Sequence, residues 1–420
     1  MEDKEINQLV VSTHDLVGGA ARSTYRLFKA FKKTSFKNLK SNMLVQYKDS
    51  SDSNIFKSES VFDKLWGKII SIKDLLPLNK YKDKVSSMWS LGWIPNNVSK
   101  QILKFNPDIV HLNWVGRGFL PIKELSKIKK PIVWTFHDMW AFTGGCHYSF
   151  ECKRYTDFCG DCPQLLSKKE NDISRALLKK KKRYWDKLNI TIVCPSNWLA
   201  QCSKESYLFG NIKTEVIPYT IDAEVFKPVD KSEAKKILNL PQNKKIILFG
   251  GLSAIGDRRK GFQYLIPALK KLEEEFSVDD LEILIFGAQK PKDEVKSKFI
   301  FNYLGYIHDD ITLSIIYSAA DIFVMPSIQD NLPNTVLESM ACGTPVTAFN
   351  IGGNPDMIEH KINGYLAQPF EIDDLAEGIK WVLTDAKELS LKARKKILNN
   401  YSQELITDKY TELFKKILNK

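Results

Sequence analysis

Two acidic residues, Asp330 and Glu338, lie eight positions apart in a stretch that combines a turn with the start of a helix. A helix is expected over residues 335–341, with Glu338 on its first turn. A carboxylate in that place complements the helix dipole, and it can accept hydrogen bonds from both hydroxyls of a ribose. N–H groups at the start of the helix favour an anionic group such as a diphosphate. The pair suits a nucleotide sugar, although a turn residue and a dipole partner would explain it equally well.

The elements around this pair follow from the hydrophobic pattern. Residues 321–325 form an apolar run that predicts a buried parallel strand. Residues 331–334 carry Pro and Asn in turn positions, and Asn334 or Thr335 is the expected N-cap. A helix that begins at the carboxyl end of a parallel strand directs its amides toward the crevice where α/β proteins bind ligands. The backbone N–H groups of Asn334, Thr335 and Val336 are therefore expected to hold the diphosphate.

The spacing of the two acids, with seven residues between them, resembles the donor-site signature of the family 4 retaining glycosyltransferases, which have the GT-B fold. Most members have Glu at the first position, so Asp330 is a departure with a shorter reach. The resemblance implies that Glu338 binds the ribose and that Asp330 binds a hydroxyl of the donor sugar. It also implies a nucleotide-diphosphate sugar of UDP or GDP type as the donor.

Apolar, strand-sized runs alternate with longer stretches of helical period along the chain, which predicts the α/β class. The expected strands form two series: residues 8–12, 109–113, 132–136 and 190–194, then residues 245–249, 281–286, 322–325 and 345–349. Each series predicts one Rossmann-like, doubly wound domain with a parallel sheet. Under the resemblance, the two domains face each other across a cleft, as in the GT-B fold.

Two prolines bracket an extended segment that has no helical period, at residues 216–228, and the domain junction is expected there. The predicted organisation is an acceptor domain over residues 1–217 and a donor domain over residues 218–400. Residues 401–420 have helical period and resemble the helix that crosses back to the first domain in GT-B enzymes.

A cationic run, Arg258, Arg259 and Lys260, precedes Gly261 after the first strand of the second domain. Most such runs are solvated surface charge, but this loop is expected to open onto the same crevice as the acidic pair. The family places an Arg just after the strand and a Lys before the glycine. Lys260 matches the second position and Leu252 occupies the first, so Arg259 or Arg258 is expected to supply the missing charge. Fixed cations stabilise a leaving diphosphate, and we therefore expect no catalytic metal.

Further candidates lie in the first domain. Gly18 and Gly19 follow its first strand. A simple turn explains them as well as the glycine loop that faces the donor in the family. His137 follows the strand at residues 132–136, and the resemblance assigns it to the sugar pocket, whereas an isolated His is more often structural. His14 and His111 are weaker candidates, since neighbouring loop backbone would satisfy each of them.

Four of the seven cysteines lie within seventeen residues: Cys146, Cys152, Cys159 and Cys162. In a reducing cytosol such crowding favours a thiolate metal site, with free thiols and disulfides as the alternatives. The spacing of the last two is typical of a structural zinc site, and four thiolates would close the metal shell. The segment at about residues 144–165 resembles an insertion in a colanic-acid, polysaccharide-cluster branch of the family.

Composition limits the partners. The 420 residues suffice for two or three domains, and the formal net charge of +12 favours nucleic acid, anionic lipid or a phosphorylated substrate. Apolar runs stay far below the roughly 20 residues that cross a bilayer, and the N-terminus has no signal-peptide core. We therefore expect a cytoplasmic protein. Residues 62–76 predict a core-facing helix or one in the membrane interface, and Lys179–Arg183 either attracts anionic lipid or forms a solvated helix face.

Taken together, these residues predict a retaining glycosyltransferase of cell-surface polysaccharide synthesis, acting at the inner face of the membrane on a glycan or polyprenyl-linked saccharide. Lys260 and Arg259 would neutralise the diphosphate, while Asp330 and His137 position the sugar. Retention is an implication of the resemblance. One alternative is a nucleotide-sugar epimerase of the same architecture, which would act on the donor alone. The other is a basic zinc-knuckle protein with salt-dependent nucleic-acid binding, which would leave both acids unexplained.

Overall fold

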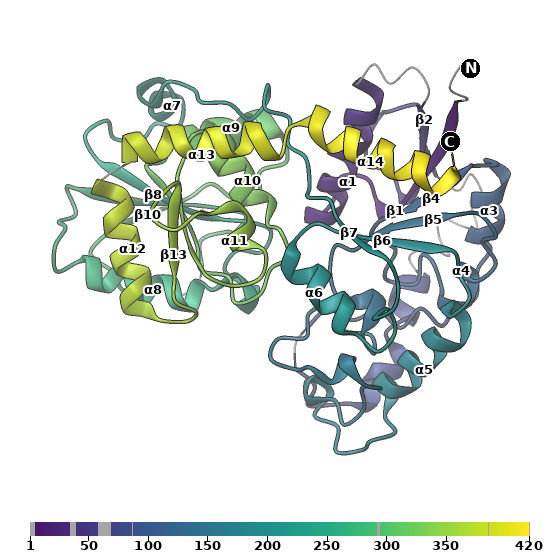
Figure 1. Ribbon diagram of the computed structural model, residues 1–420. Helices are drawn as coiled ribbons and strands as arrows, with labels where there is room; N and C mark the ends of the chain where they lie inside the picture. Colours follow the sequence, from purple (N-terminus) through teal and green to yellow (C-terminus); the bar gives the residue numbers. More distant parts are fainter. Residues whose placement is uncertain are drawn as a thin grey trace. The chain divides into compact units, whose positions relative to one another are not determined.

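The computed structural model describes residues 5–33, 39–57, 69–85, 87–291, 295–384 and 386–419. The chain forms two compact units (Figure 1). The N-terminal unit comprises residues 1–218 and 406–420, and the C-terminal unit comprises residues 219–405.

A parallel sheet of seven strands forms the centre of the N-terminal unit, in the order β3-β2-β1-β4-β5-β6-β7. The strands are β1 (Ile6–His14), β2 (Leu39–Tyr47), β3 (Ile55–Lys57), β4 (Ile109–Leu112), β5 (Ile132–Thr135), β6 (Ile190–Cys194) and β7 (Thr214–Val216). Every residue of β4 and β5 is buried, because helices cover both faces of the sheet. The chain runs outward from β1 to β3 and then returns to β4 on the other side of β1. This reversal places a topological switch point between β1 and β4.

The helices of the N-terminal unit include α1 (Gly19–Lys33), α3 (Val98–Lys104), α4 (Ile122–Leu125), α5 (Ile173–Trp185) and α6 (Asn197–Glu205). Two of them, α5 and α6, begin at side-chain caps. Asp172 accepts hydrogen bonds from the backbone at the start of α5, and Ser196 does so at the start of α6. The terminal helix α14 (Gln403–Leu418) packs Tyr410 and Phe414 against the strands of this unit.

The C-terminal unit has a parallel sheet of six strands, in the order β10-β9-β8-β11-β12-β13. The strands are β8 (Lys245–Gly250), β9 (Leu281–Phe286), β10 (Ile300–Tyr303), β11 (Ile322–Met325), β12 (Val346–Phe349) and β13 (Gly364–Ala367). Here the chain reverses between β8 and β11, so the switch point lies between these two neighbouring strands.

Helices cover both faces of this second sheet. They are α7 (Lys231–Ile237), α8 (Phe262–Leu272), α9 (Asp310–Ala319), α10 (Asn334–Ala341), α11 (Asn354–Met357), α12 (Ile372–Thr384) and α13 (Ala386–Asn400). Alternate residues of β8 enter different apolar clusters: Ile246 and Leu248 belong to one, Ile247 and Phe249 to the other. The sheet thus has a core on each side. The predicted α/β class with two doubly wound domains is confirmed.

For two segments, contact with a membrane was one of two predicted alternatives. In the first, Phe62, Leu65 and Trp66 lie outside the described residues, whereas Ile70 is 3% exposed and Leu75 packs against the core, as expected of a core-facing helix. The cationic run Lys179–Arg183 lies on α5, but it is not a uniformly solvated face, because Lys181 is only 1% exposed. Its ammonium group donates to the carbonyl oxygen of Thr143 at 3.0 Å, and helical period places it on the buried side of α5.

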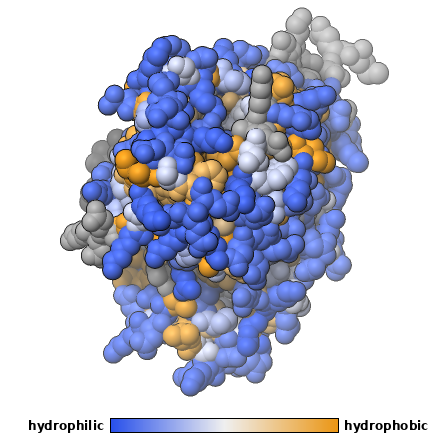
Figure 2. All heavy atoms as spheres, turned by 90° about the vertical axis from the view of Figure 1, so that its left-hand side faces the viewer, coloured by the Kyte–Doolittle hydropathy of each residue, from blue (hydrophilic) through white to orange (hydrophobic). Residues whose placement is uncertain are grey.

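Hydrophilic side chains dominate the face of the molecule seen in Figure 2, with apolar ones in scattered groups. In the described part of the chain, every helix is too short or too polar to cross a bilayer.

Candidate functional site

Asp330 lies among cations after β11. Its Oδ2 atom accepts a hydrogen bond from Arg259 Nη1 at 2.9 Å and another from Lys260 Nζ at 2.9 Å. The Asp330 side chain is 14% exposed. Burial alone would raise the pKa of this carboxyl, but the charges of Lys260 and Arg259 hold its pKa at about 2. The two predicted cations and the first predicted acid are therefore brought together, as ion pairs.

Close backbone contacts fix this cluster. Gly261, with φ +80°, ends the cationic turn, and a Cβ atom there would lie 1.7 Å from the carbonyl oxygen of Pro326. Ile328 donates its amide to the carbonyl of Arg259 at 2.9 Å. Gly352, after β12, approaches the Asp330 carbonyl so closely that a Cβ would stand 1.9 Å from its oxygen. Only glycine fits at two of these contacts, which lock the loops after β8, β11 and β12 together.

Gly251 marks the point where three predicted segments meet. It follows β8 with φ +142°, and a Cβ there would lie 3.9 Å from Lys260 Cε and 4.0 Å from Thr335 Cγ2. The end of β8, the cationic turn and the start of α10 therefore surround one position at the switch point. Leu252, the residue in place of the family's first Arg, is 59% exposed. Arg258 lies in the same 3₁₀ turn as the two cations that contact Asp330.

The start of α10 differs from the prediction. The N-cap is Pro333, in extended conformation and without a side-chain cap, so neither Asn334 nor Thr335 takes that place. Because the helix begins at Asn334, Glu338 is its fifth residue and lies in the second turn rather than the first. The amide of Val336 already donates to the Pro333 carbonyl at 3.1 Å. Of the three predicted amides, this one is engaged within the turn itself.

Glu338 is held from a neighbouring helix. Its side chain is buried, and its Oε2 atom accepts a hydrogen bond from the hydroxyl of Tyr317, on α9, at 2.9 Å. This contact fixes the direction of a carboxylate that lies one helical turn beyond the first residues of α10. Tyr317 was not predicted, since it lies 21 residues away and has no local signal.

In the N-terminal unit, the glycine turn leads into helix α1, and His137 contacts a side chain of the same helix. Gly18, with φ +96°, precedes α1, and Gly19 is its first residue. His137 Nε2 lies 3.0 Å from Asn113 Oδ1 and 3.4 Å from the hydroxyl of Thr24, on α1. Burial lowers the pKa of His137 to about 4, so the imidazole is neutral at pH 7.

The two weaker histidine candidates have different surroundings. His111 Nδ1 lies 2.9 Å from Gln8 Nε2, and His111 Nε2 lies 2.8 Å from the Thr135 hydroxyl. Strand side chains, not loop backbone, satisfy it, and burial lowers its pKa to about 3. His14 stacks on Tyr47, and its Nδ1 has no hydrogen-bond partner among the described residues. The expectation of loop-backbone partners was wrong for both.

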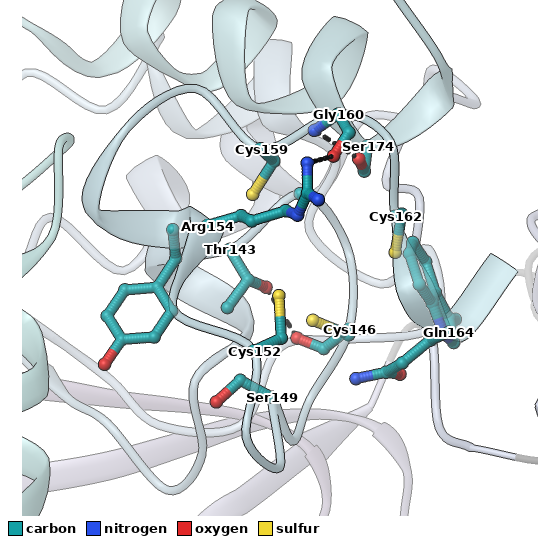
Figure 3. Close-up of a pocket in the computed structure, with 13 residues that line it drawn as sticks. Thr143, Cys146, Ser149, Cys152, Arg154, Cys159, Gly160, Cys162, Gln164 and Ser174 are labelled. Atoms are coloured by element: carbon teal, nitrogen blue, oxygen red, sulfur yellow. Dashed lines mark hydrogen bonds between the residues drawn. The ribbon is translucent and has the colours of Figure 1, made fainter. Parts of the chain in front are cut away.

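The four clustered cysteines line one small pocket (Figure 3). Burial raises the pKa of each of three thiols, to about 12 for Cys159, to about 11 for Cys162 and further for Cys146. These three cysteines and Cys152 are all free, so none of the four forms a disulfide. A thiolate zinc site needs four sulfurs about 2.3 Å from one metal. Within the described ranges, no three His, Cys, Asp or Glu side chains are placed to hold a metal ion, so the geometry gives no support to the predicted zinc site.

A second pocket, with room for about one water molecule, adjoins His137. Asp138 lines it, together with aromatic residues from the ends of β4 and β5. Sequence reasoning passed over Asp138, although its position directly after a strand and a candidate histidine was a usable signal.

Two protein-family models match the chain, one mostly in each of the two units. Residues 230–402 match the family model described as Glycosyl transferases group 1, and residues 75–225 match that of Glycosyltransferase Family 4. Two segments of the chain therefore resemble glycosyltransferase domains. Neither match extends to the colanic-acid branch in particular, which stays a prediction.

Curated relatives cover parts of the chain. One is the UDP-Gal:alpha-D-GlcNAc-diphosphoundecaprenol alpha-1,3-galactosyltransferase of Escherichia coli, 29% identical over 51% of this chain and 56% of its own. An uncharacterized glycosyltransferase of Methanocaldococcus jannaschii is 29% identical over 44% of this chain and 48% of its own. Sulfoquinovosyl transferase SQD2 of Arabidopsis thaliana is 26% identical over 76% of this chain and 58% of its own. The chain spans about half the length of the curated relatives it matches first.

Solved structures resemble the whole chain. Sucrose-phosphate synthase from Thermosynechococcus elongatus has a TM-score of 0.69 at 17% identity and covers 98% of this chain and 99% of its own. Anabaena Alr3699/HepE, in complex with UDP and glucose, has a TM-score of 0.63 at 16% identity and covers 97% and 99%. At such identities the likeness shows the fold alone. The predicted GT-B fold is confirmed.

Proposed function

We propose that the protein is a glycosyltransferase that moves a sugar from a nucleotide-diphosphate sugar to a glycan or lipid-linked saccharide, with retention of configuration. The observation that carries the proposal is the cluster of Arg259, Lys260 and Asp330 at the switch point of the C-terminal unit, beside the start of α10. Ligands of open parallel sheets bind at such points. Two mostly buried cations next to a helix start suit a diphosphate.

The proposed roles follow from the contacts. Arg259 and Lys260 bind the diphosphate and stabilise the charge that it gains as the sugar bond breaks, while the Asn334 and Thr335 amides add donors at the start of α10. The Gly251 turn borders the same position, and Arg258, in the same 3₁₀ turn as the two cations, adds a further positive charge. Once the cations turn to the diphosphate, Asp330 is released to accept a hydrogen bond from a sugar hydroxyl. No protein nucleophile and no metal are required in this scheme.

Glu338 binds the ribose in this proposal, with Tyr317 holding its carboxylate in place. In the N-terminal unit, neutral His137 contacts the sugar, and Gly18 and Gly19 allow close approach of the backbone. Structural neighbours support a UDP-type donor, because HepE has been solved with UDP and with UDP-glucose. The name of the Escherichia coli relative supports a saccharide on a polyprenyl diphosphate as the acceptor, and hence a role in cell-surface polysaccharide synthesis.

The test is stabilisation by nucleotide diphosphates, since a ligand that binds only the folded state raises the melting temperature. We expect UDP or GDP at about 100 times its Kd to stabilise the protein by about 2.7 kcal/mol. Glu338→Ala should abolish that shift, whereas Glu371→Ala, at an exposed position, should retain it. An unchanged shift in Glu338→Ala contradicts the ribose assignment. Incubation with the donor alone, followed by analysis of the sugar, separates transfer from epimerisation.

A further inference from the structure

The pocket beside His137 has the composition of a carbohydrate subsite. It lies at the carboxyl ends of β4 and β5, next to the switch point of the N-terminal unit. Its aromatic lining consists of Trp134, Phe136 and Trp140, which belong to the core and are only 2–4% exposed, and of the partly exposed Trp114. Asp138 is its one acidic lining residue. Small-molecule sites are typically apolar and aromatic, with a few fixed polar groups that orient the ligand.

Asp138 is held by donors from three segments. Its Oδ2 atom accepts from Trp114 Nε1 at 2.7 Å and from His147 Nδ1 at 2.6 Å, and its Oδ1 atom accepts from the Trp140 amide at 2.9 Å. A carboxylate offers about four lone-pair sites, so these three bonds leave room for one more donor. The side chain retains 10% exposure on the pocket wall. The carboxylate is thus fixed, yet still able to accept.

His147 and Ser90 form a buried chain of hydrogen bonds that ends at the Asp138 carboxylate, called the relay below. His147 Nε2 lies 2.8 Å from the hydroxyl of Ser90, and the amide of Arg117 donates to the same Ser90 oxygen at 2.8 Å. The imidazole of His147 thus bridges the two side chains, with Nδ1 toward the carboxylate of Asp138 and Nε2 toward the hydroxyl of Ser90. Ser, His and Asp in this order resemble a hydrolytic triad, but Ser90 is only 1% exposed and its oxygen is occupied by an amide. The relay therefore serves the carboxylate and not a serine nucleophile.

Gly116 shows that the pocket wall and the relay fit each other. A Cβ at this position would lie 3.0 Å from Ser90 Oγ, 3.0 Å from Trp114 Cζ2 and 3.2 Å from His147 Cε1. The backbone of Gly116 also accepts from the hydroxyl of Thr13, at the end of β1, at 3.2 Å. The strand ends that flank the switch point thus hold the indole and the imidazole against Asp138.

We propose that Asp138 accepts a hydrogen bond from a hydroxyl of the saccharide acceptor, and that His147 and Ser90 are positioning residues. The inference rests on the proposed function and names a substrate contact for it. The pocket has room for a single hydroxyl group of the sugar, and the ring of the sugar stays outside it.

The experiment follows Trp114 by fluorine NMR in the full chain labelled with fluorinated tryptophan, with Trp114→Phe to assign its signal. The probes are methyl α-glycosides of glucose, galactose, mannose and N-acetylglucosamine. At least one should move the Trp114 signal of the natural protein, and Asp138→Asn should weaken that response at least tenfold. If none moves the signal, or if Asp138→Asn responds equally, the proposal is overturned.

The positioning role of His147 is tested separately, with two substitutions of this residue. His147→Asn retains a donor at the position of Nδ1, toward Asp138, and should keep most of the glycoside response, whereas His147→Phe should lose it. Equal responses of these two variants overturn the positioning role. Stabilisation by UDP or GDP should be the same in every variant, which shows that the C-terminal unit is intact. Loss of that stabilisation in the natural protein counts against the proposed function, whereas its retention without a glycoside response counts against this subsite alone.

Discussion

Asp330 and Asp138 are both mostly buried carboxylates after the ends of parallel strands, yet their partners differ in kind. Asp330 faces two cations, Arg259 and Lys260. Asp138 faces an indole, a backbone amide and the imidazole of His147. A carboxylate between cations is a natural stand-in for a phosphate, because the same cations can exchange one anion for another. A carboxylate fixed by an indole, an amide and an imidazole is built to stay in place. The Asp330 carboxylate can thus be exchanged for another anion, whereas the Asp138 carboxylate is held in one position.

The largest expected effect comes from the backbone fit around the Asp330 cluster. Gly261→Ala places a Cβ 1.7 Å from a carbonyl oxygen at a positive φ, and should cost about 3 kcal/mol or more of unfolding free energy. Gly116→Ala, beside Asp138, meets side chains at 3.0 Å and should cost about 1 kcal/mol. Gly256→Ala, with nothing within 4 Å of its Cβ, is the control. Urea unfolding of the three variants in parallel measures the order, and equal losses would contradict it.

The next largest effect comes from removing the charge of each acid. The loss of unfolding free energy should be greater for Asp330 than for Asp138. Asp330→Asn removes the anion that pairs with Lys260 and one of the two that pair with Arg259, which keeps Asp257 at 3.1 Å, and should destabilise by about 3 kcal/mol. Adding Lys260→Met should recover more than half of that loss, because one stranded cation is removed with its partner. Asp138→Asn strands no permanent cation and should cost about 2 kcal/mol. A double-variant cycle by urea unfolding tests the coupling, and its absence would show that the ion pair contributes little.

Acid should weaken the N-terminal unit before the C-terminal one. Burial lowers the pKa of His111 to about 3 and that of His137 to about 4, so each takes up a proton on unfolding once the pH falls below 6.5. The unfolded state then binds more protons, and stability falls with pH by about 2 kcal/mol per histidine at pH 5. Asp330, with a pKa of about 2, keeps its contribution until the pH falls below 3.8 and loses it down to pH 2.

Tryptophan fluorescence measures this difference, because eight of the nine tryptophans precede Pro218. Urea midpoints by fluorescence should fall between pH 7 and pH 5, and His111→Asn should reduce the slope by about half. A midpoint that stays level across this range would show that the two histidines do not control acid stability.

Much of the fold was predictable from apolar runs, and the exceptions have physical reasons. The bounds of β6, β9 and β11 match the predicted runs, since strands buried on both faces read as continuous apolar sequence. β3 and β7 were missed because edge strands of three residues depend on pairing with a neighbour rather than on their own pattern. β2 was missed because polar residues interrupt its sequence.

The candidate site divides in the same way. Spacing placed Asp330, Lys260 and Glu338 at one sheet edge, but the direct pairing of Asp330 with the cations depends on the short reach of Asp and on loop contacts between distant segments. The relay from Ser90 to Asp138 joins residues 48 positions apart through His147. No local pattern encodes such a contact, because the topology of the sheet brings its members together.

The smallest expected effect concerns single neutral donors, one in each unit. Tyr317→Phe removes the hydroxyl that donates to Glu338 and should cost about 1 kcal/mol, since a buried acceptor loses one partner. It should also weaken stabilisation by UDP or GDP several-fold, because the carboxylate that contacts the ribose is no longer held. Trp114→Phe removes one of three donors to Asp138 and should leave nucleotide stabilisation unchanged. Tyr306→Phe, at an exposed position, is the control for loss of a hydroxyl. Melting curves with and without nucleotide decide the case: if Tyr317→Phe and Trp114→Phe respond alike, Tyr317 does not act through Glu338.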